Sequence, residues 1–453
     1  MAGEIKLTGL VSDINWNKLI EDIITARKAY LIVPYQNAKA RIEDRFSAIR
    51  EVNVRLSETL NYIKTKRLQL KEGYDLKTYT LRSSEPALSP DSLLGVTLKE
   101  GAAIGTYEVR VLRLAQAEKV ASDPLPAKDQ GLSFSGTIIL NGKAIDIEAN
   151  DSLLNIASKI NRANLGVSAK VISLNDGDHR LTLESLREGA QGISFEDPNG
   201  ILRNLGVLDE LGNKKNVIRA GQNSVVEIDG FQVEYQSNTL TDIIPGMTLQ
   251  LKGESQSAKI VVSVRTDNKG IAENVSGLIS RINGLLNFIG NQNRSDASRR
   301  PLSGEANLIS LKNNIISASY REVQENAQFK TLSSIGITFG KDGVMHFDSS
   351  KFSDALSTNS AEVVNVLTKF GKALEDELNF LINPQTGTLI RIEDSIESQI
   401  SKIDQRVKEI EKRLEREREM LEKKYSALEL LISRSKLLRS WMENQVKAMF
   451  KRD

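Results

Sequence analysis

Residues 396–431 read IESQISKIDQRVKEIEKRLEREREMLEKKYSALELL, with apolar residues recurring at alternating spacings of four and three. Apolar residues that recur about every 3.5 positions cannot all stay on one side of a straight helix, so such a helix buries its stripe by supercoiling against a partner. Charged residues flank the stripe, and Glu417 and Lys424 interrupt it. The stretch therefore predicts one helix of a coiled coil. Its predicted seam consists of Ile396, Ile400, Ile403, Val407, Ile410, Leu414, Leu421 and Leu428.

A second seam of the same kind follows Pro34, toward the other end of the chain. Asn53 and Arg67 interrupt it. Each seam needs a partner helix, so the economical fold brings the two ends together as one antiparallel coiled stem. The polar interruptions weaken the seams locally, and we expect a stem that can open and close. The members of this second seam are Ile42, Phe46, Ile49, Leu56, Leu60 and Ile63.

A short amphipathic helix is predicted over residues 16–31, with Asn15 available as its N-cap and Pro34 closing the segment. Its apolar face includes Trp16, Leu19, Ile20 and Ile23. Trp16 and Trp441 lie near opposite ends of the chain on apolar helical faces. At these positions, packing within the chain and docking onto a helix of another protein are equally compatible with the pattern.

Between the coils, residues 74–268 read as short β-rich runs separated by Gly, Asn, Asp and Pro. Asn141-Gly142 and Asp229-Gly230 supply the positive φ angles of type I′ turns and predict two hairpins. Similar polar clusters and a leucine follow both hairpins, which leaves open whether the β region arose by duplication. Helical periodicity returns over residues 269–330, where a second helix is expected at 306–328.

These patterns predict an α+β multidomain protein, in which an antiparallel α-helical coiled-coil stem from both termini carries two inserted β-rich head domains. At 453 residues and 40% hydrophobic content, the chain can build more than one core. The expected domains are an N-terminal amphipathic leg at 1–41, a discontinuous stem at 42–73 and 269–430, a discontinuous first head at 74–128 and 222–268, a second head at 129–221, and a basic amphipathic C-terminal leg at 431–453.

The composition argues against several classes of function. The formal net charge is only +2, which disfavours nucleic acid as a partner. There is no cysteine, and the two histidines are His179 and His346, too few for a histidine-rich zinc site. No phosphate-binding loop, nucleophile elbow or HExxH pair is present. We therefore expect no cofactor, no metal site and no enzymatic activity.

Hydropathy argues against a membrane protein. No apolar run reaches the roughly 18 residues that are needed to span a bilayer. Near the N-terminus, Glu4, Lys6 and Asp13 interrupt the apolar residues. We expect no membrane insertion and no cleaved signal peptide. If the protein leaves the cell, the export machinery must recognise a signal other than a hydrophobic leader peptide.

Two stretches in the first third of the chain resemble the flagellar filament-capping family, also called hook-associated protein 2. Residues 9–36 carry Asp13-Ile14-Asn15 followed by Leu19-Ile20, with Val11-Ser12 where glycine is common in the family. Residues 105–122 read GTYEVRVLRLAQAEKVAS and closely match the family's strand with its Leu-Ala-Gln-Ala ending. This second stretch is the most specific part of the resemblance.

Two later stretches extend the resemblance over most of the chain. Residues 139–169, with their Asn141-Gly142 hairpin, are similar to a motif shared by flagellin and hook proteins. Residues 332–356, with Ile335-Gly336-Ile337-Thr338 and Phe347-Asp348, resemble the family's C-terminal domain. The coil after Gly387 fits the family as well.

The resemblance implies a structural cap at the distal end of the bacterial flagellar filament, located outside the cell and exported through the flagellum's own type III channel. Family members form a closed ring, here expected to contain five subunits or close to it, that promotes flagellin insertion and filament elongation for motility. The implied partners are flagellin, the hook–filament junction proteins and a cytoplasmic export chaperone. The terminal residues expected to dock onto flagellin or neighbouring axial proteins are Trp16, Leu19, Ile20, Ile23 and Trp441.

The alternative is another secreted coiled-coil protein, such as an adhesin or a needle-tip-like binding module, because such proteins also pair helical ends with a variable insert. Residues 105–122 and 332–356 argue against it. An enzyme with an unfamiliar site in the β heads is the third interpretation, and clear turnover of a hydrolase substrate would support it.

Overall fold

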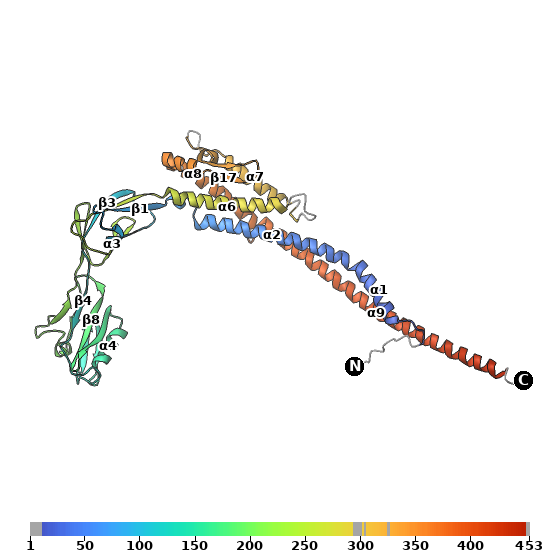
Figure 1. Cartoon of the computed structure of the whole chain (residues 1–453), viewed down its shortest axis with the longest axis horizontal. Coiled ribbons are helices and arrows are strands. Elements are labelled where there is room, and N and C mark those ends of the chain that lie inside the picture. The colour runs from blue at the N-terminus through green and yellow to red at the C-terminus, as the bar shows by residue number, and fades with distance from the viewer. Residues whose placement is uncertain (1–10, 293–300, 303–304, 324–326, 450–453) are drawn as a thin grey trace. The chain divides into compact units, whose positions relative to one another are not determined.

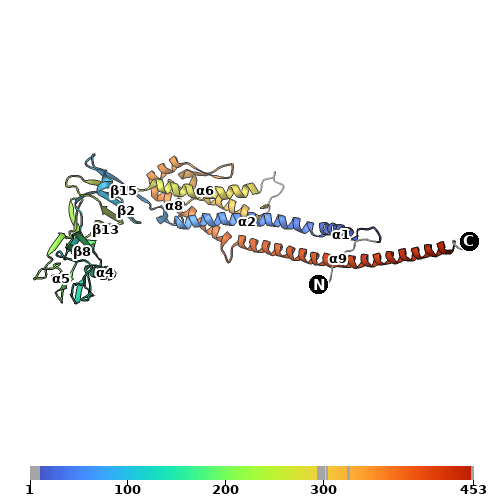
Figure 2. The same cartoon turned by 60° about the horizontal axis from the view of Figure 1, so that its bottom comes forward.

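The computed structural model describes residues 11–292, 301–302, 305–323 and 327–449 of the chain (Figures 1 and 2). It divides into two compact units. One unit combines Met1–Tyr74 with Lys269–Asp453 and is mainly helical, and the other, Asp75–Asn268, consists mainly of β-strands. This arrangement confirms the predicted α+β fold with helical ends and an inserted β-rich part.

Long helices form the helical unit. Asn15 caps the first of them as predicted, because its Oδ1 accepts a hydrogen bond from Lys18 N. Pro34 lies in the first turn of the second helix, where a missing N–H removes no helical hydrogen bond. The elements are α1 (Trp16–Leu31), α2 (Val33–Thr65), η1 (Lys71–Tyr74), α6 (Asn268–Gln292), α7 (Ala306–Tyr320), η2 (Leu332–Ile335), β16 (Ile337–Phe339), β17 (Met345–Phe347), α8 (Ser349–Ile382) and α9 (Thr388–Met449).

The helix expected at 306–328 is shorter than predicted. α7 ends at Tyr320, and Arg321 adopts an extended conformation. Val323 N then donates a hydrogen bond to Lys330 O, which returns the chain toward η2. The requirement to turn back at this point overrides the local helical pattern.

The core of the helical unit lies where α2 packs against α8 and α9, and Figures 1 and 2 both show α2 beside α9. Ile49, Leu56 and Ile63 of α2 are fully buried. Leu374 and Leu378 of α8 are buried as well. Each such side chain contributes roughly 1.5–3 kcal/mol through burial, so apolar packing is the main stabilising force here.

Gly371 allows α8 to approach the backbone that follows α2. A Cβ at this position would lie 2.3 Å from Leu68 O and 2.8 Å from Leu68 C. The Tyr74 hydroxyl, which is buried, donates a hydrogen bond to the same Leu68 carbonyl at 2.9 Å. The contact is therefore between two backbones that are held in place, and only glycine fits.

The β unit contains two lobes with separate apolar cores. In the first lobe, an antiparallel sheet has the strand order β1-β15-β3-β11-β12, and a second sheet has the order β13-β14-β2. Their apolar faces bury Val109, Val226, Leu249 and Ile260 in one cluster. The elements are β1 (Lys77–Ser83), α3 (Pro90–Leu93), β2 (Leu94–Leu98), β3 (Gly105–Arg113), β11 (Ser224–Ile228), β12 (Phe231–Tyr235), β13 (Thr239–Ile244), β14 (Met247–Leu251) and β15 (Ile260–Thr266).

The second lobe has sheets of order β10-β4-β8-β7 and β6-β5-β9. After β6 the chain forms the helix α4, whose N-cap Ser152 accepts a hydrogen bond from Asn155 N. α4 buries Ile156 and Ile160 in the core of this lobe. The elements are β4 (Ala117–Ala121), β5 (Gly136–Leu140), β6 (Lys143–Ile147), α4 (Leu153–Arg162), β7 (Val167–Asn175), β8 (Asp178–Glu188), β9 (Phe195–Glu196), α5 (Ile201–Asn204) and β10 (Asn216–Arg219).

Both predicted type I′ hairpins are present. Asn141 and Gly142 have φ angles of 50° and 77°, and Asp229 and Gly230 have φ angles of 49° and 86°. They join β5 to β6 and β11 to β12. After the first hairpin the chain enters α4, whereas after the second it continues into β13. The similarity that suggested duplication therefore ends with the hairpins.

The chain enters the second lobe earlier than predicted. The first head was expected to extend to residue 128, but β4 pairs with β8, and Val120 of β4 lies in the core of the second lobe. Residues 106–121 contain neither glycine nor proline and read as one β-rich run. No turn residue therefore marks the crossing from one lobe to the other.

Replacing Gly371 by alanine is expected to destabilise the helical unit by about 1–3 kcal/mol, because the added methyl group would overlap the Leu68 carbonyl. Gly284→Ala is the matched control, since a Cβ at this position inside α6 would lie 3.8 Å from its nearest neighbour, Arg55 Nη1. The control should gain up to about 1 kcal/mol from helix propensity. Thermal unfolding followed by far-ultraviolet circular dichroism checks both, and equal melting temperatures would contradict the tight contact.

Candidate functional site

The two ends of the chain pair as antiparallel helices. Along α1 and α2, Arg27 contacts Glu417 at 3.3 Å, and Asn53 Nδ2 donates to Glu393 Oε1 at 3.0 Å. As the residue number rises on one side it falls on the other, which defines the antiparallel register. Glu417 and Asn53 are two of the polar residues that interrupt the seams, so the partner helix satisfies both interruptions.

The predicted seam residues are buried to different degrees. Ile49, Leu56, Leu60, Ile63, Ile396, Ile410 and Leu414 are buried. Ile42, Phe46, Ile400, Ile403, Val407 and Leu421 are partly buried. Leu428 is 40% exposed. Along this part of α9 the partner is α1 or α2, and two paired helices cover each side chain from one side only.

A small apolar cluster marks the junction between α1 and α2. Ile32 is buried there with Ile410 and Leu414 of α9, and Tyr35 and Val407 pack against them. The cluster occupies the point where α1 ends and α2 begins, so α9 contacts both helices. It is much smaller than the core around α2 and α8, and this part of the pairing is correspondingly weak.

Near the N-terminal end of α1, a terminal clamp consisting of Val11, Ser12, Trp16, Tyr425 and Glu429 joins the chain to α9. The Trp16 ring stacks on the Tyr425 ring with 4.8 Å between centroids. The Glu429 carboxylate accepts hydrogen bonds from Trp16 Nε1 at 2.8 Å and Ser12 Oγ at 2.6 Å. Val11 N and Ser12 N donate to it at 3.0 and 3.1 Å. One carboxylate thus fixes the turn that precedes α1.

The terminal clamp favours the ionised form of Glu429. Hydrogen bonds from the Ser12 hydroxyl and the Trp16 indole, with smaller contributions from the two backbone N–H groups, lower the pKa of Glu429 to about 2. The carboxylate is therefore charged at every pH at which the pairing is expected to matter.

Beyond the terminal clamp, α9 presents an apolar face to solvent, which we call the terminal face. Trp441 is 60% exposed and Leu438 is 60% exposed. Basic residues, among them Arg434 and Arg439, flank these side chains. Contiguous exposed apolar surface of this kind marks interaction sites. The terminal face consists of Leu430, Leu431, Leu437, Leu438, Trp441, Met442 and Val446.

The structure separates the predicted docking residues into two groups. Trp16 and Ile20 are buried against the rest of the chain, and Ile23 is partly buried. Leu19 and Trp441 are exposed. For the first group, a partner helix can bind only if α1 leaves α9.

Sequence reasoning missed Tyr425 and Glu429. The seam pattern placed Lys424 in the stripe, but Lys424 is exposed and the neighbouring Tyr425 faces Trp16. A straight helix has 3.6 residues per turn, so the buried stripe drifts relative to a strict seven-residue repeat. The aromatic Tyr425, four positions after Leu421, was the sequence feature that could have indicated the buried position.

The two histidines and the acidic residues were the candidates for a metal site in the parts of the chain that the structure describes. No group of three or more His, Cys, Asp or Glu residues could hold a metal ion there. His179 contacts Ser173 Oγ at 2.6 Å, and His346 contacts Asp342 at 3.1 Å, both in ordinary surface hydrogen bonds. None of the described helices is long and apolar enough to cross a membrane.

Acid is expected to open the terminal clamp. The folded-state pKa of Glu429, about 2, lies below the ordinary value of 4.5. The stabilisation is therefore fully present above about pH 5 and is lost as the pH falls toward 2. In a Trp441→Phe background, acrylamide quenching of the remaining Trp16 should rise over this range.

Glu429→Gln should raise Trp16 quenching already at pH 7 and reduce its further change in acid. Glu443→Gln is the matched control, because Glu443 lies on the same helix and pairs with Arg439 at its surface. Equal quenching at pH 7 in the two variants would show that Glu429 does not hold the turn in place.

Three family models match the chain. The model described as "Flagellar hook-associated protein 2 N-terminus" matches residues 12–118, and "Flagellar hook-associated protein 2 C-terminus" matches residues 221–436. A third model, "Flagellin hook IN motif", matches residues 131–186. The two models of hook-associated protein 2 thus cover most of the helical unit and the first β lobe, and the third lies within the second β lobe.

Curated relatives and solved structures agree with these matches. The B-type flagellar hook-associated protein 2 of Pseudomonas aeruginosa is 27% identical over 352 residues, which cover 70% of this chain and 73% of the relative. Flagellar hook-associated protein 2 of Aeromonas caviae is 23% identical, covering 88% and 89% of the two chains. The crystal structure of the D1-D2-D3 domains of the flagellar cap protein FliD from Escherichia coli shares the fold, with a TM-score of 0.65 and 22% identity, over 77% of this chain and 99% of that one. This chain therefore belongs to the flagellar hook-associated protein 2 family, a family of flagellar cap proteins rather than enzymes.

Proposed function

We propose that this protein caps the distal end of the bacterial flagellar filament, outside the cell. A closed ring of five or nearly five copies sits at the growing end, promotes the insertion of flagellin and so elongates the filament for motility. Membership of the hook-associated protein 2 family supports this role. The role needs no bond-making chemistry, in keeping with the purely structural character of the family.

The terminal face is the observation that carries the proposal. Leu438, Trp441 and their apolar neighbours continue along α9 beyond the last residues that α1 covers. An amphipathic helix of a partner can lie along such a face and bury it by coiled-coil packing. Flagellin is the proposed partner at this face, and the hook–filament junction proteins and an export chaperone are further proposed partners of the chain.

Exchange of helices gives a mechanism for gripping and releasing flagellin. The pairing of α1 with α9 depends on the terminal clamp, on the buried Ile20 and Ile24 of α1, and on one small apolar cluster. A partner helix that binds α9 more tightly in the open state shifts the population toward that state. Leu19 and Trp441 are accessible before the exchange, whereas Trp16, Ile20 and Ile23 become available when α1 leaves.

The finer domain plan belongs to the same proposal. Residues 1–41 and 431–453 act as legs that contact axial proteins, and residues 42–73 with 269–430 act as the stem. The two β lobes act as heads in the ring. The exposure of the terminal face, which lies mostly within the C-terminal leg, supports this division.

Assembly of the purified full chain tests the proposal. Light scattering and negative-stain electron microscopy, with and without polymerising flagellin, should reveal closed rings that seat on filament ends. A strict monomer that ignores flagellin would contradict the cap role and favour an adhesin-like or needle-tip-like module instead.

Leu438→Ser should weaken binding to flagellin. A buried leucine contributes roughly 1.5–3 kcal/mol, which corresponds to about a tenfold to hundredfold loss of affinity. Met420→Ser is the matched control, because Met420 is 65% exposed on the same helix but lies outside the terminal face. Filament-end binding, measured by co-sedimentation, should fall in the first variant and persist in the second. Equal binding would rule out the terminal face as the docking site.

A further inference from the structure

We infer that residues 114–116, where the chain crosses from the first β lobe to the second, form a rigid joint, and that Asn238 is its positioning residue. The crossing joins β3 to β4, and a second crossing near residues 220–223 joins β10 to β11. The apolar cores of the two lobes are separate clusters. Because lobes connected by short linkers move relative to each other by default, a fixed geometry here requires specific contacts. The inference does not rest on the cap role.

The side chain of Asn238 forms two hydrogen bonds with the backbone of Ala115, as a neighbouring β-strand would. Ala115 N donates to Asn238 Oδ1 at 2.8 Å, and Asn238 Nδ2 donates to Ala115 O at 2.9 Å. The same asparagine reaches the second lobe, because its backbone N and its Nδ2 donate to the Glu188 carboxylate, each at 2.7 Å. One residue of the first lobe thus holds both the crossing and the end of β8.

The backbone groups of Leu114 and Gln116, the other two residues of the crossing, are hydrogen-bonded as completely as those of Ala115. Leu114 N donates to Glu254 Oε1 at 2.7 Å, and Leu114 O accepts from Gln222 Nε2 at 3.0 Å. Gln116 N donates to Gln222 O at 2.9 Å, and Gln116 O accepts from Gly189 N at 3.2 Å. Every backbone N–H and C=O of residues 114–116 therefore has a partner, which a flexible hinge would not show.

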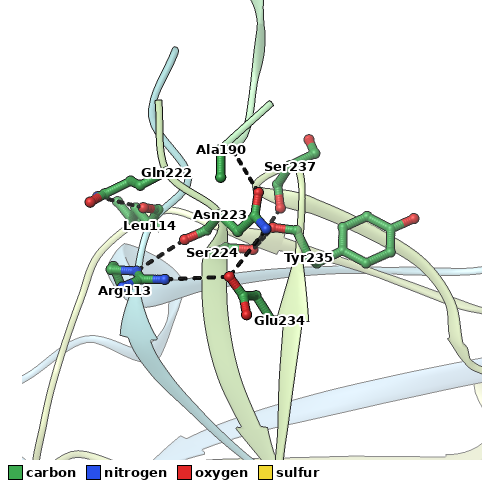
Figure 3. A network of polar contacts seen from close by, with 9 residues as sticks. All are labelled: Arg113, Leu114, Ala190, Gln222, Asn223, Ser224, Glu234, Tyr235 and Ser237. Carbon is green, nitrogen blue, oxygen red and sulfur yellow. Dashed lines mark hydrogen bonds and ion pairs between the residues drawn. The ribbon is translucent and has the colours of Figure 1, made fainter. Parts of the chain in front are cut away.

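A second asparagine braces the other crossing, as Figure 3 shows. Asn223 Oδ1 accepts from Ala190 N at 2.7 Å, which ties the start of β11 to the loop after β8. Its Nδ2 donates to Glu234 Oε1 of β12 at 3.1 Å. Arg113 Nε donates to Asn223 O at 3.0 Å, so the ends of β3 and β11 are also joined. The network connects both crossings to both lobes.

The backbones meet too closely for side chains to intervene. A Cβ on Gly189, whose φ is 113°, would lie 2.8 Å from Gln236 O. A Cβ on Gly221 would lie 2.4 Å from Gly189 O. These contacts leave little room for the segments to slide past one another, so the polar network and the close backbones act together.

Two other asparagines bind one strand residue through the same pair of hydrogen bonds that joins Asn238 to Ala115, and we call this arrangement an asparagine bracket. Asn161 Nδ2 donates to Ala169 O in β7, and Asn161 Oδ1 accepts from Ala169 N. Asn283 makes the same two hydrogen bonds with Met345 in β17. In both places the side chain extends a strand edge within a single lobe or unit. At Ala115 the same device acts between two lobes, which identifies the crossing as structured rather than as a linker.

Spin labelling of the full chain tests the joint, and the absence of cysteine makes labelling specific. Gln232→Cys and Lys170→Cys place labels on exposed residues of β12 and β7, one in each lobe. Pulsed electron–electron double resonance should give a narrow distance distribution. Asn238→Ala should broaden it at least twofold. Asn238→Asp should do the same, because the carboxylate loses the Nδ2 donor and faces Glu188.

Two controls keep the result interpretable. A pair within the second lobe, Lys170→Cys with Lys143→Cys, should keep its distance in every variant, which shows that the lobe stays folded. Asn283→Asp breaks the same kind of bracket in the helical unit and should leave the interlobe width unchanged. If Asn238→Ala changes the distance between the labels at positions 170 and 143, the interlobe width is judged from the Asn238→Asp variant instead. An unaltered width in the Asn238 variants, or an equally broad distribution in the unsubstituted chain, would overturn the inference.

Discussion

The antiparallel pairing of α1 and α2 with α9 is the constraint on which the architecture depends. It brings sequence positions near the two termini side by side, as Trp16 and Tyr425 show. The whole β unit is consequently an insertion between two halves of the helical unit. The exposed ion pairs along the helices, such as Arg27 with Glu417, contribute little energy in water, so the register depends on the apolar contacts and the terminal clamp.

The two units achieve order by different means. In the helical unit, closely packed apolar side chains and the contact at Gly371 fix the helices. In the β unit, each lobe has its own core, and asparagine side chains complete the backbone hydrogen bonding where strands end or cross. Such networks stabilise a structure only when every group is satisfied, and residues 114–116 meet this condition.

Local patterns in the sequence predicted the local features of the fold. The spacing of apolar residues indicated the long terminal helices, and Asn141-Gly142 indicated a type I′ turn that the structure confirms. Contacts between distant residues were not predictable in the same way. Glu429 reads as one more charged residue on a charged helix until the register places it beside Trp16. Likewise, nothing in the sequence around Ala115 marks it as the partner of Asn238.

The terminal clamp has a consequence for how the chain reaches its native state. Ser12 and Glu429 are 417 positions apart in sequence, so their contact has a very high contact order. Loop-closure entropy makes such contacts slow to form unless the intervening chain has already folded. Within each unit, hairpins and helices form first from neighbouring residues. The two ends of the chain are therefore expected to remain unpaired until synthesis has produced the last helix, and an incomplete chain exposes α1 as a single amphipathic helix.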